Sequence, residues 1–203
     1  MDYVKFFKDK NIEINLKECY ITNNICMAIN QIEEAFKYIK IQNYLTIIKT
    51  GKINENARIE GKILTIKEGI TYEQIQNNRT IKNGLEIFKN NEDLPKDLLT
   101  NKNYLLSPKN TNNATGLIIH ELGHTLSTYK NSFYSDFVKF VNKATKTKDY
   151  MYEKGYKELC LNALLGDSEF FADAFSDYIV NKNNASVAGK LIPKFLKEQG
   201  IIE

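Results

Sequence analysis

The sequence of 203 residues contains no tryptophan, only three prolines, three cysteines and two histidines. The cysteines are odd in number and unpatterned in spacing, which argues against a disulfide framework and against a cysteine-based metal site. They are Cys19, Cys26 and Cys160. We expect small buried side chains at these positions. Because both histidines lie in a single motif, a Cys–His nucleophilic pair is also disfavoured.

Long apolar runs and a strong charge of one sign are missing as well. No run approaches the roughly 20 apolar residues of a membrane-spanning helix. Residues 1–18 lack the apolar centre of a signal peptide, which predicts an intracellular protein or a mature form. A net charge of +3, with lysines spread along the chain, does not favour nucleic acid or a membrane surface. The length and the 42% hydrophobic content predict one globular domain.

The first half of the chain predicts a helix followed by a small sheet. Apolar residues recur every three or four positions in residues 22–40, behind polar capping side chains, which predicts an amphipathic helix. Residues 44–49 and 62–67 are rich in β-branched side chains and predict two strands. Residues 103–108 fit a short edge strand that ends at Pro108.

The second half predicts helices alone. Their ranges are about 111–129, 132–144, 156–166, 167–181 and 187–198, the last with Pro193 inside it. Gly166 is a natural helix stop, and Asp167 opens the next helix with acidic residues where the helix dipole favours them. The fold class is therefore α+β, with a helix and sheet subregion in residues 1–110 and a helical subregion in residues 111–203.

Both histidines lie in residues 118–129, IIHELGHTLSTY. Chance places two histidines four residues apart in about 1% of chains of this length, before the intervening glutamate is required. On a helix this spacing puts His120 and His124 on one face, so that both imidazoles can bind one zinc ion. Glu121 lies about 100° around the helix, where it can act as general base toward a metal-activated water. The alternative is two ordinary histidines on a partly exposed helix.

Gly123 lies within this same helix. Glycine in a helix costs roughly 0.5–1 kcal/mol relative to alanine, so something should compensate for it. A close approach by a neighbouring segment beside the metal would do so. The alternative is a tolerated glycine with no role.

A catalytic zinc ion needs a third protein ligand, and no further histidine exists. Glu169, Asp173 and Asp177 recur once per helical turn, with no basic residue until Lys182. A solvated face would ordinarily mix in basic residues, so we expect these carboxylates near the interior. We predict Glu169 as the third ligand and Asp173 as the hydrogen-bond acceptor that orients a liganding histidine. Asp177 is expected at the surface or in a helix–helix contact.

The motifs HELGH at residues 120–124 and EFFADAF at residues 169–175 resemble the lethal factor-like zinc peptidases. This family includes the catalytic domain of anthrax lethal factor and the secreted Pro-Pro endopeptidases of clostridia. The resemblance is specific over about residues 116–180. It implies a zincin-like, gluzincin-type metalloprotease fold with one catalytic Zn²⁺ bound by His120, His124 and Glu169. It also implies a secreted, toxin-related protein, although residues 1–18 carry no export signal.

One position departs from the family pattern. The family places a tyrosine shortly before the ligand glutamate, where its hydroxyl stabilises the oxyanion of the reaction. Residues 161–168, LNALLGDS, contain no tyrosine. Tyr156 lies further upstream and is the candidate for this role, ahead of Tyr152 and Tyr150.

The sequence therefore predicts a single-domain zinc endopeptidase that acts on a protein or peptide, with a monomer as the default state. Residues 62–67 and 103–108 are the candidates for aligning the substrate backbone by strand addition. The alternative is a catalytically silent, zinc-stabilised module that binds a protein partner, such as a toxin accessory or a phage or mobile-element protein. A third hypothesis is an intracellular regulatory protease that cleaves a single host or repressor protein.

Overall fold

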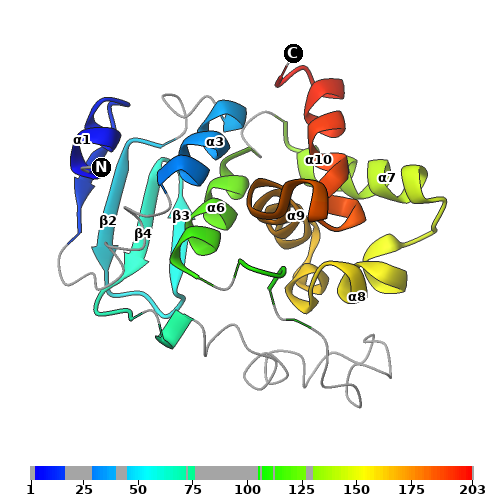
Figure 1. Ribbon diagram of the computed structural model, residues 1–203, viewed down its shortest axis with the longest axis horizontal. Coiled ribbons are helices and arrows are strands. Elements are labelled where there is room, and N and C mark those ends of the chain that lie inside the picture. The colour runs from blue at the N-terminus through cyan, green and yellow to red at the C-terminus, as the bar shows by residue number, and fades with distance from the viewer. Residues whose placement is uncertain are drawn as a thin grey trace.

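The computed structural model describes residues 3–16, 29–39, 45–71, 73–75, 105, 107–111, 113–126 and 130–202. It is an α+β protein, as predicted, with the small sheet on one side and most helices on the other (Figure 1). Helices α3 (Ile29–Ile39) and α6 (Ala114–His124) lie between the sheet and α9 (Asp167–Asn181). Among the described helices, none has the length and apolar character needed to cross a membrane.

The sheet has four strands in the order β1-β2-β4-β3. Their bounds are Glu13–Asn15 for β1, Ile47–Gly51 for β2, Ala57–Glu60 for β3 and Ile63–Lys67 for β4. The first three strands in this order run parallel, and β3 pairs with β4 in the antiparallel sense. The predicted strands 44–49 and 62–67 correspond to β2 and β4. Leu64 and Ile66 of β4 are fully buried, which anchors the sheet in the core.

The sheet order corrects the prediction for substrate alignment. Residues 62–67 form β4, whose two edges are both occupied, by β2 and by β3. This segment has no free backbone to offer to an extended peptide, so that prediction is wrong. Of residues 103–108 the structure describes Leu105, Ser107 and Pro108, and these three form no strand.

The helical part agrees closely with the sequence pattern except at one segment. Its remaining helices are α7 (Phe133–Thr145), the π-helical turn η4 (Met151–Gly155), α8 (Tyr156–Glu158), the 3₁₀ turns η5 (Leu161–Leu165) and η6 (Lys182–Asn184), and α10 (Val187–Glu198). A short helix α1 (Tyr3–Lys8) precedes the sheet. The predicted helix 22–40 is confirmed over Ile29–Ile39, whereas its expected caps lie outside the described residues.

The predicted continuous helix 156–166 is wrong, because the chain breaks between α8 and η5. Cys160 has extended backbone angles, and the Leu161 amide donates to the Leu105 carbonyl at 2.7 Å instead of to a preceding helical turn. Gly166 then adopts a φ of +143°, a region that side chains disfavour, and the chain turns into α9. The break wraps η5 against the beginning of α9.

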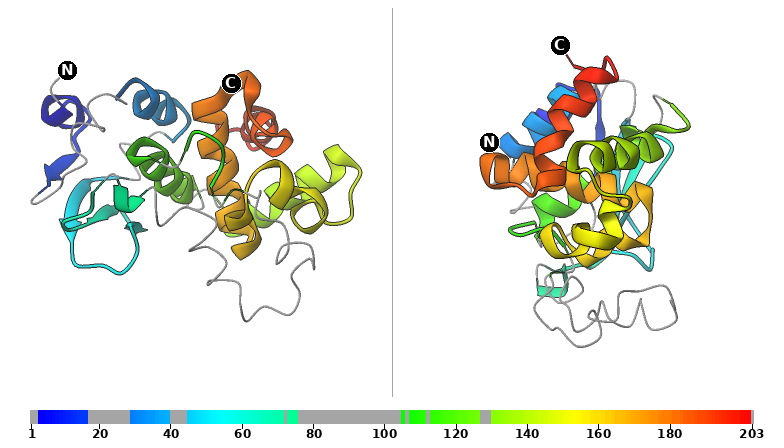
Figure 2. Two further views of the ribbon diagram at one scale, coloured as in Figure 1. Left: turned by 60° about the horizontal axis from the view of Figure 1, so that its bottom comes forward. Right: turned by 90° about the vertical axis from the view of Figure 1, so that its right-hand side faces the viewer.

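Helix α6 is buried over nearly its whole length, from Ala114 to Gly123. The Asn113 side chain caps its start by accepting from the Gly116 amide at 2.9 Å. Gly123 allows the close approach expected of it, since a Cβ there would lie 3.1 Å from the Ala172 Cα of α9. The two helices therefore pack nearly backbone to backbone. Figure 2 shows them side by side.

Aromatic rings hold α9 from its other side. Phe171 of α9 packs edge-on against Phe133 and Phe137 of α7, with ring centroids 4.9 and 5.1 Å apart. Phe195 of α10 contacts Phe133 and Phe137 as well, at 5.2 and 5.1 Å. Edge-to-face packing of this kind adds to the gain from burial. Helix α9 is thus fixed between α6 and the α7–α10 layer.

Replacement of Gly123 by valine tests the packing of α6 against α9. Helix propensity alone makes valine no worse than glycine, so any large loss must come from the contact with Ala172. We expect Gly123→Val to lower the free energy of unfolding by about 1–3 kcal/mol through overpacking. Ala144→Val, at an exposed position of α7, is the control and should change it little. Chemical denaturation measures the free energy of unfolding of both variants. Equal decreases in Gly123→Val and Ala144→Val would contradict close packing at Gly123.

Candidate metal centre

Three side chains from two helices converge on one point. The Nε2 atoms of His120 and His124 lie 3.2 Å apart. The Glu169 carboxylate lies 3.2 Å from the His120 Nε2 through one oxygen and 3.3 Å from the His124 Nε2 through the other. Their potential ligand atoms all lie within 4.8 Å of one another. The cluster is compatible with a metal ion, and it joins the three residues that the sequence analysis singled out as ligands.

The two helices bring these groups together from distant parts of the chain. His120 and His124 occupy the last turns of α6, and Glu169 lies in the first turn of α9. The Tyr134 hydroxyl of α7 donates to the His124 carbonyl at 2.5 Å, and its ring stands edge-on to the imidazole with centroids 6.3 Å apart. These contacts fix the end of α6 where the second imidazole is presented.

Asp173 contacts His120, as predicted. Its Oδ1 lies 2.8 Å from the His120 Nδ1, and its side chain is fully buried. If Nδ1 carries the proton, Nε2 is left free to face Glu169 and His124. The other oxygen of Asp173 accepts from the Cys160 thiol at 3.1 Å and from the Asn162 amide at 3.0 Å. Buried carboxylates need such donors, and Asp173 has three of them.

The sequence analysis missed Asn162 and the contact made by Cys160. Cys160 is buried, as expected, but its thiol contacts a carboxylate as well as the core. Asn162 also donates to the Glu169 Oε2 at 3.0 Å, so that it touches two acids of the site. One signal for it exists in the sequence, because an amide side chain interrupts the apolar run of residues 159–165. Cys19 and Cys26 lie outside the described residues.

The carboxylates make this a strongly cation-favouring site. Burial acts to lower the pKa of His120, but Asp173, then Glu169 and Glu121, outweigh it and raise that pKa to about 10. Burial likewise acts to raise the pKa of Glu169, whereas hydrogen bonds from His120 and His124 hold it well below its usual range. The field that keeps a proton on His120 also favours a divalent cation.

Glu121 is buried beside the cluster without taking part in it. Its exposed fraction is 8%. Within the part of the chain that the structure describes, no group forms a hydrogen bond or ion pair with its carboxylate. Its carboxylate is therefore available, as far as the described residues show, to accept a proton beside the ligands.

Asp177 and Tyr156 complete the list of predicted residues. Asp177 is 3% exposed, so the surface interpretation is wrong and the helix–helix interpretation holds. It accepts from the Ser186 amide and from the Asn181 side chain, both at 2.7 Å, and so joins α9 to the start of α10. Tyr156 is buried in α8 with the Lys157 ammonium 5.0 Å from its ring centroid. Its role toward an oxyanion stays a prediction.

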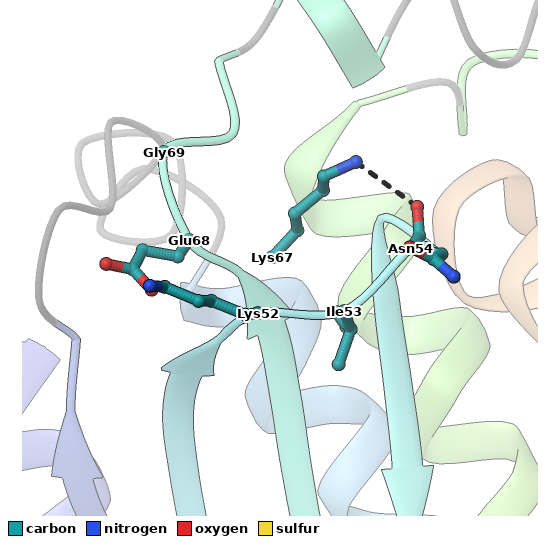
Figure 3. Close-up of a pocket in the computed structure, with 6 residues that line it drawn as sticks. All are labelled: Lys52, Ile53, Asn54, Lys67, Glu68 and Gly69. Atoms are coloured by element: carbon teal, nitrogen blue, oxygen red, sulfur yellow. Dashed lines mark hydrogen bonds between the residues drawn. The ribbon is translucent and has the colours of Figure 1, made fainter.

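A shallow hollow of about 380 Å³ lies at the end of the sheet, apart from this cluster (Figure 3). Its lining consists of Lys52, Ile53, Asn54, Lys67, Glu68 and Gly69. The Lys67 ammonium donates to the Asn54 carbonyl at 3.2 Å across it. The hollow shares no residue with the histidine cluster, and its mixed charges do not define a ligand.

Comparison of the chain with protein-family models gives no match, and comparison with curated proteins gives no relative. The resemblance to the lethal factor-like peptidases therefore depends on the motif residues alone.

Replacement of Asp173 by asparagine tests the orienting contact. The variant keeps the side-chain volume but removes the charge that holds the His120 imidazole, so Zn²⁺ affinity should fall about 10- to 100-fold. Asp177→Asn is the matched control, because this acid is also buried on α9, one turn further along. It should lower stability without changing affinity. Titration against a competing chelator measures the Zn²⁺ affinity of both variants. An unchanged affinity in Asp173→Asn would contradict the role assigned to Asp173.

Proposed function

We propose that the protein is a zinc-dependent endopeptidase of the zincin-like, lethal factor-like type. The observation that carries this proposal is the convergence of His120, His124 and Glu169 beside the Glu121 carboxylate, which has no hydrogen-bond or ion-pair partner among the described residues. A purely structural metal site has no need of a further carboxylate next to its ligands. A hydrolase needs one, because water must lose a proton as it attacks the substrate.

The spacing of the ligand atoms supports zinc as the metal. Bonds of 2.0–2.1 Å in a tetrahedron separate neighbouring ligand atoms by about 3.3–3.4 Å. In the cluster the two imidazole nitrogens lie 3.2 Å apart, and Glu169 approaches them at 3.2 and 3.3 Å, through a different carboxylate oxygen in each case. Two imidazoles and one carboxylate form a donor set that zinc accepts readily, and three protein ligands leave the fourth position for water or substrate.

The residues of the chain then have separate tasks. When bound, Zn²⁺ would supply Lewis acidity toward the substrate carbonyl and the attacking water. Glu121 accepts the proton of that water and returns it to the leaving nitrogen of the cleaved peptide bond. Asp173 keeps the His120 ring in one orientation, which leaves Nε2 as the nitrogen that would hold the metal. Tyr156 is retained as the candidate donor to the oxyanion.

The edge strand β3 supports a peptide as the substrate. It pairs with β4 on one side, and in the described part of the chain no strand pairs with its other side. Strand β3 also contacts α6, the helix that carries the histidines. An extended peptide could add to this edge through main-chain hydrogen bonds and so lie beside the metal ligands. Strand β3 thus takes the aligning role that was expected of residues 62–67 or 103–108.

Replacement of Glu121 by glutamine separates a peptidase from a zinc-stabilised binding module. In a peptidase the variant loses its proton acceptor, and turnover of a peptide library should fall by about 10²- to 10⁴-fold. Zn²⁺ content should stay at the wild-type level, because Glu121 is not a ligand. Glu198→Gln, at an exposed position of α10, is the control and should keep full activity. Chelator-sensitive cleavage that survives in Glu121→Gln would contradict the proposed role, and a wild type that binds zinc but cleaves nothing would favour the binding module.

A further inference from the structure

Two acids of the site lie one helical turn apart on α9 and would repel each other if nothing lay between them. Glu169 and Asp173 are at positions i and i+4, the spacing at which like charges destabilise a helix. Asp173 is fully buried, where water cannot screen the repulsion. The His120 ring contacts both acids, Asp173 through Nδ1 and Glu169 through Nε2. Nε2 is, however, the atom that would bind a metal, so it would not then hold Glu169 by a hydrogen bond.

The side-chain amide of Asn162 lies between the two carboxylates. Its Nδ2 atom lies 3.0 Å from the Glu169 Oε2 and 3.0 Å from the Asp173 Oδ2. An amide nitrogen carries two protons, so one group can donate to both acids at once. Asn162 is neutral, and it therefore links the carboxylates without cancelling the negative charge that favours a cation.

The local fold explains how this side chain reaches the site. The break at Cys160 ends α8, and the bond from the Leu161 amide to the Leu105 carbonyl starts η5 in a new direction. The turn at Gly166 then brings η5 back beside the beginning of α9. Had residues 156–166 continued as one helix, this path past the first turn of α9 would be lost. The irregular segment between α8 and α9 therefore places the Asn162 side chain beside the two acids.

We infer that Asn162 is a positioning residue of the metal centre, which holds the Glu169 carboxylate in its ligand orientation by tying it to Asp173. This inference rests on the metal site of the proposed function and requires no peptidase activity. Through Asn162 the third ligand and the acid that orients His120 become one hydrogen-bonded unit. Loss of the amide frees Glu169 to rotate away from the imidazoles and leaves Asp173 with one donor fewer.

The test compares Asn162→Leu with Asn142→Leu in the full chain. Asn142 is a matched control, because its side chain also makes two hydrogen bonds, with the Tyr150 amide and the Lys148 carbonyl. It lies on α7 and contacts none of the ligands. Zn²⁺ affinity is measured by chelator competition, and the visible spectrum of the Co²⁺-substituted protein reports ligand geometry. Asn162→Ala, with a smaller side chain, serves if the leucine variant does not fold.

Asn162→Leu should lower Zn²⁺ affinity about 10- to 100-fold and shift the Co²⁺ bands, while Asn142→Leu lowers the melting temperature alone. An Asn162 variant that loses stability but keeps both wild-type affinity and spectrum would overturn the inference and reduce Asn162 to a structural residue. Failure of the proposed function gives a different result. In that case wild type binds metal and cleaves no peptide, and the effect of Asn162 on affinity is still seen.

Discussion

The close packing of α6 against α9 is the constraint on which the site depends. The imidazoles come from one helix and the two acids that contact them from the other, so the spacing between the helices sets the distances between imidazoles and acids. Gly123 makes that spacing small, because its missing side chain lets the Ala172 backbone approach. The aromatic layer of α7 and α10 presses α9 from its other side. Packing on both sides thus fixes the two helices whose side chains converge at the site.

This arrangement concentrates charge where a protein interior ordinarily excludes it. Asp173 is fully buried, and Glu121 and His120 nearly so. Each buried charge costs free energy unless other groups compensate for it, and apolar side chains of the same volume would pack at less cost. Three donors satisfy Asp173, and the histidines together with Asn162 satisfy Glu169. Glu121 is left without such a partner among the described residues. That acid is the one to which the proposed reaction assigns the proton transfer.

The periodicity of apolar residues predicted those helices and strands whose formation depends on residues close together in the sequence. Apolar patterns long enough to predict the element are present in α7, α9 and α10 and in β2 and β4. The i, i+4 spacings placed His120 with His124, and Glu169 with Asp173, on one helix face each. Strands β1 and β3 have only three and four residues and exist because they pair with longer strands. The break at Cys160 depends on a hydrogen bond between Leu161 and the distant Leu105, which no local pattern contains. Asn162 was missed for the same reason, since its partners lie on another element.

The central claim is that one zinc ion binds between α6 and α9. X-ray absorption at the zinc edge tests it most directly, on the purified chain with its metal content measured in parallel. The account predicts one zinc per chain, with four nitrogen or oxygen neighbours at about 2.0–2.1 Å and scattering from two imidazoles. A chain that retains no zinc at micromolar concentration, or a spectrum with sulfur at about 2.3 Å, would contradict it.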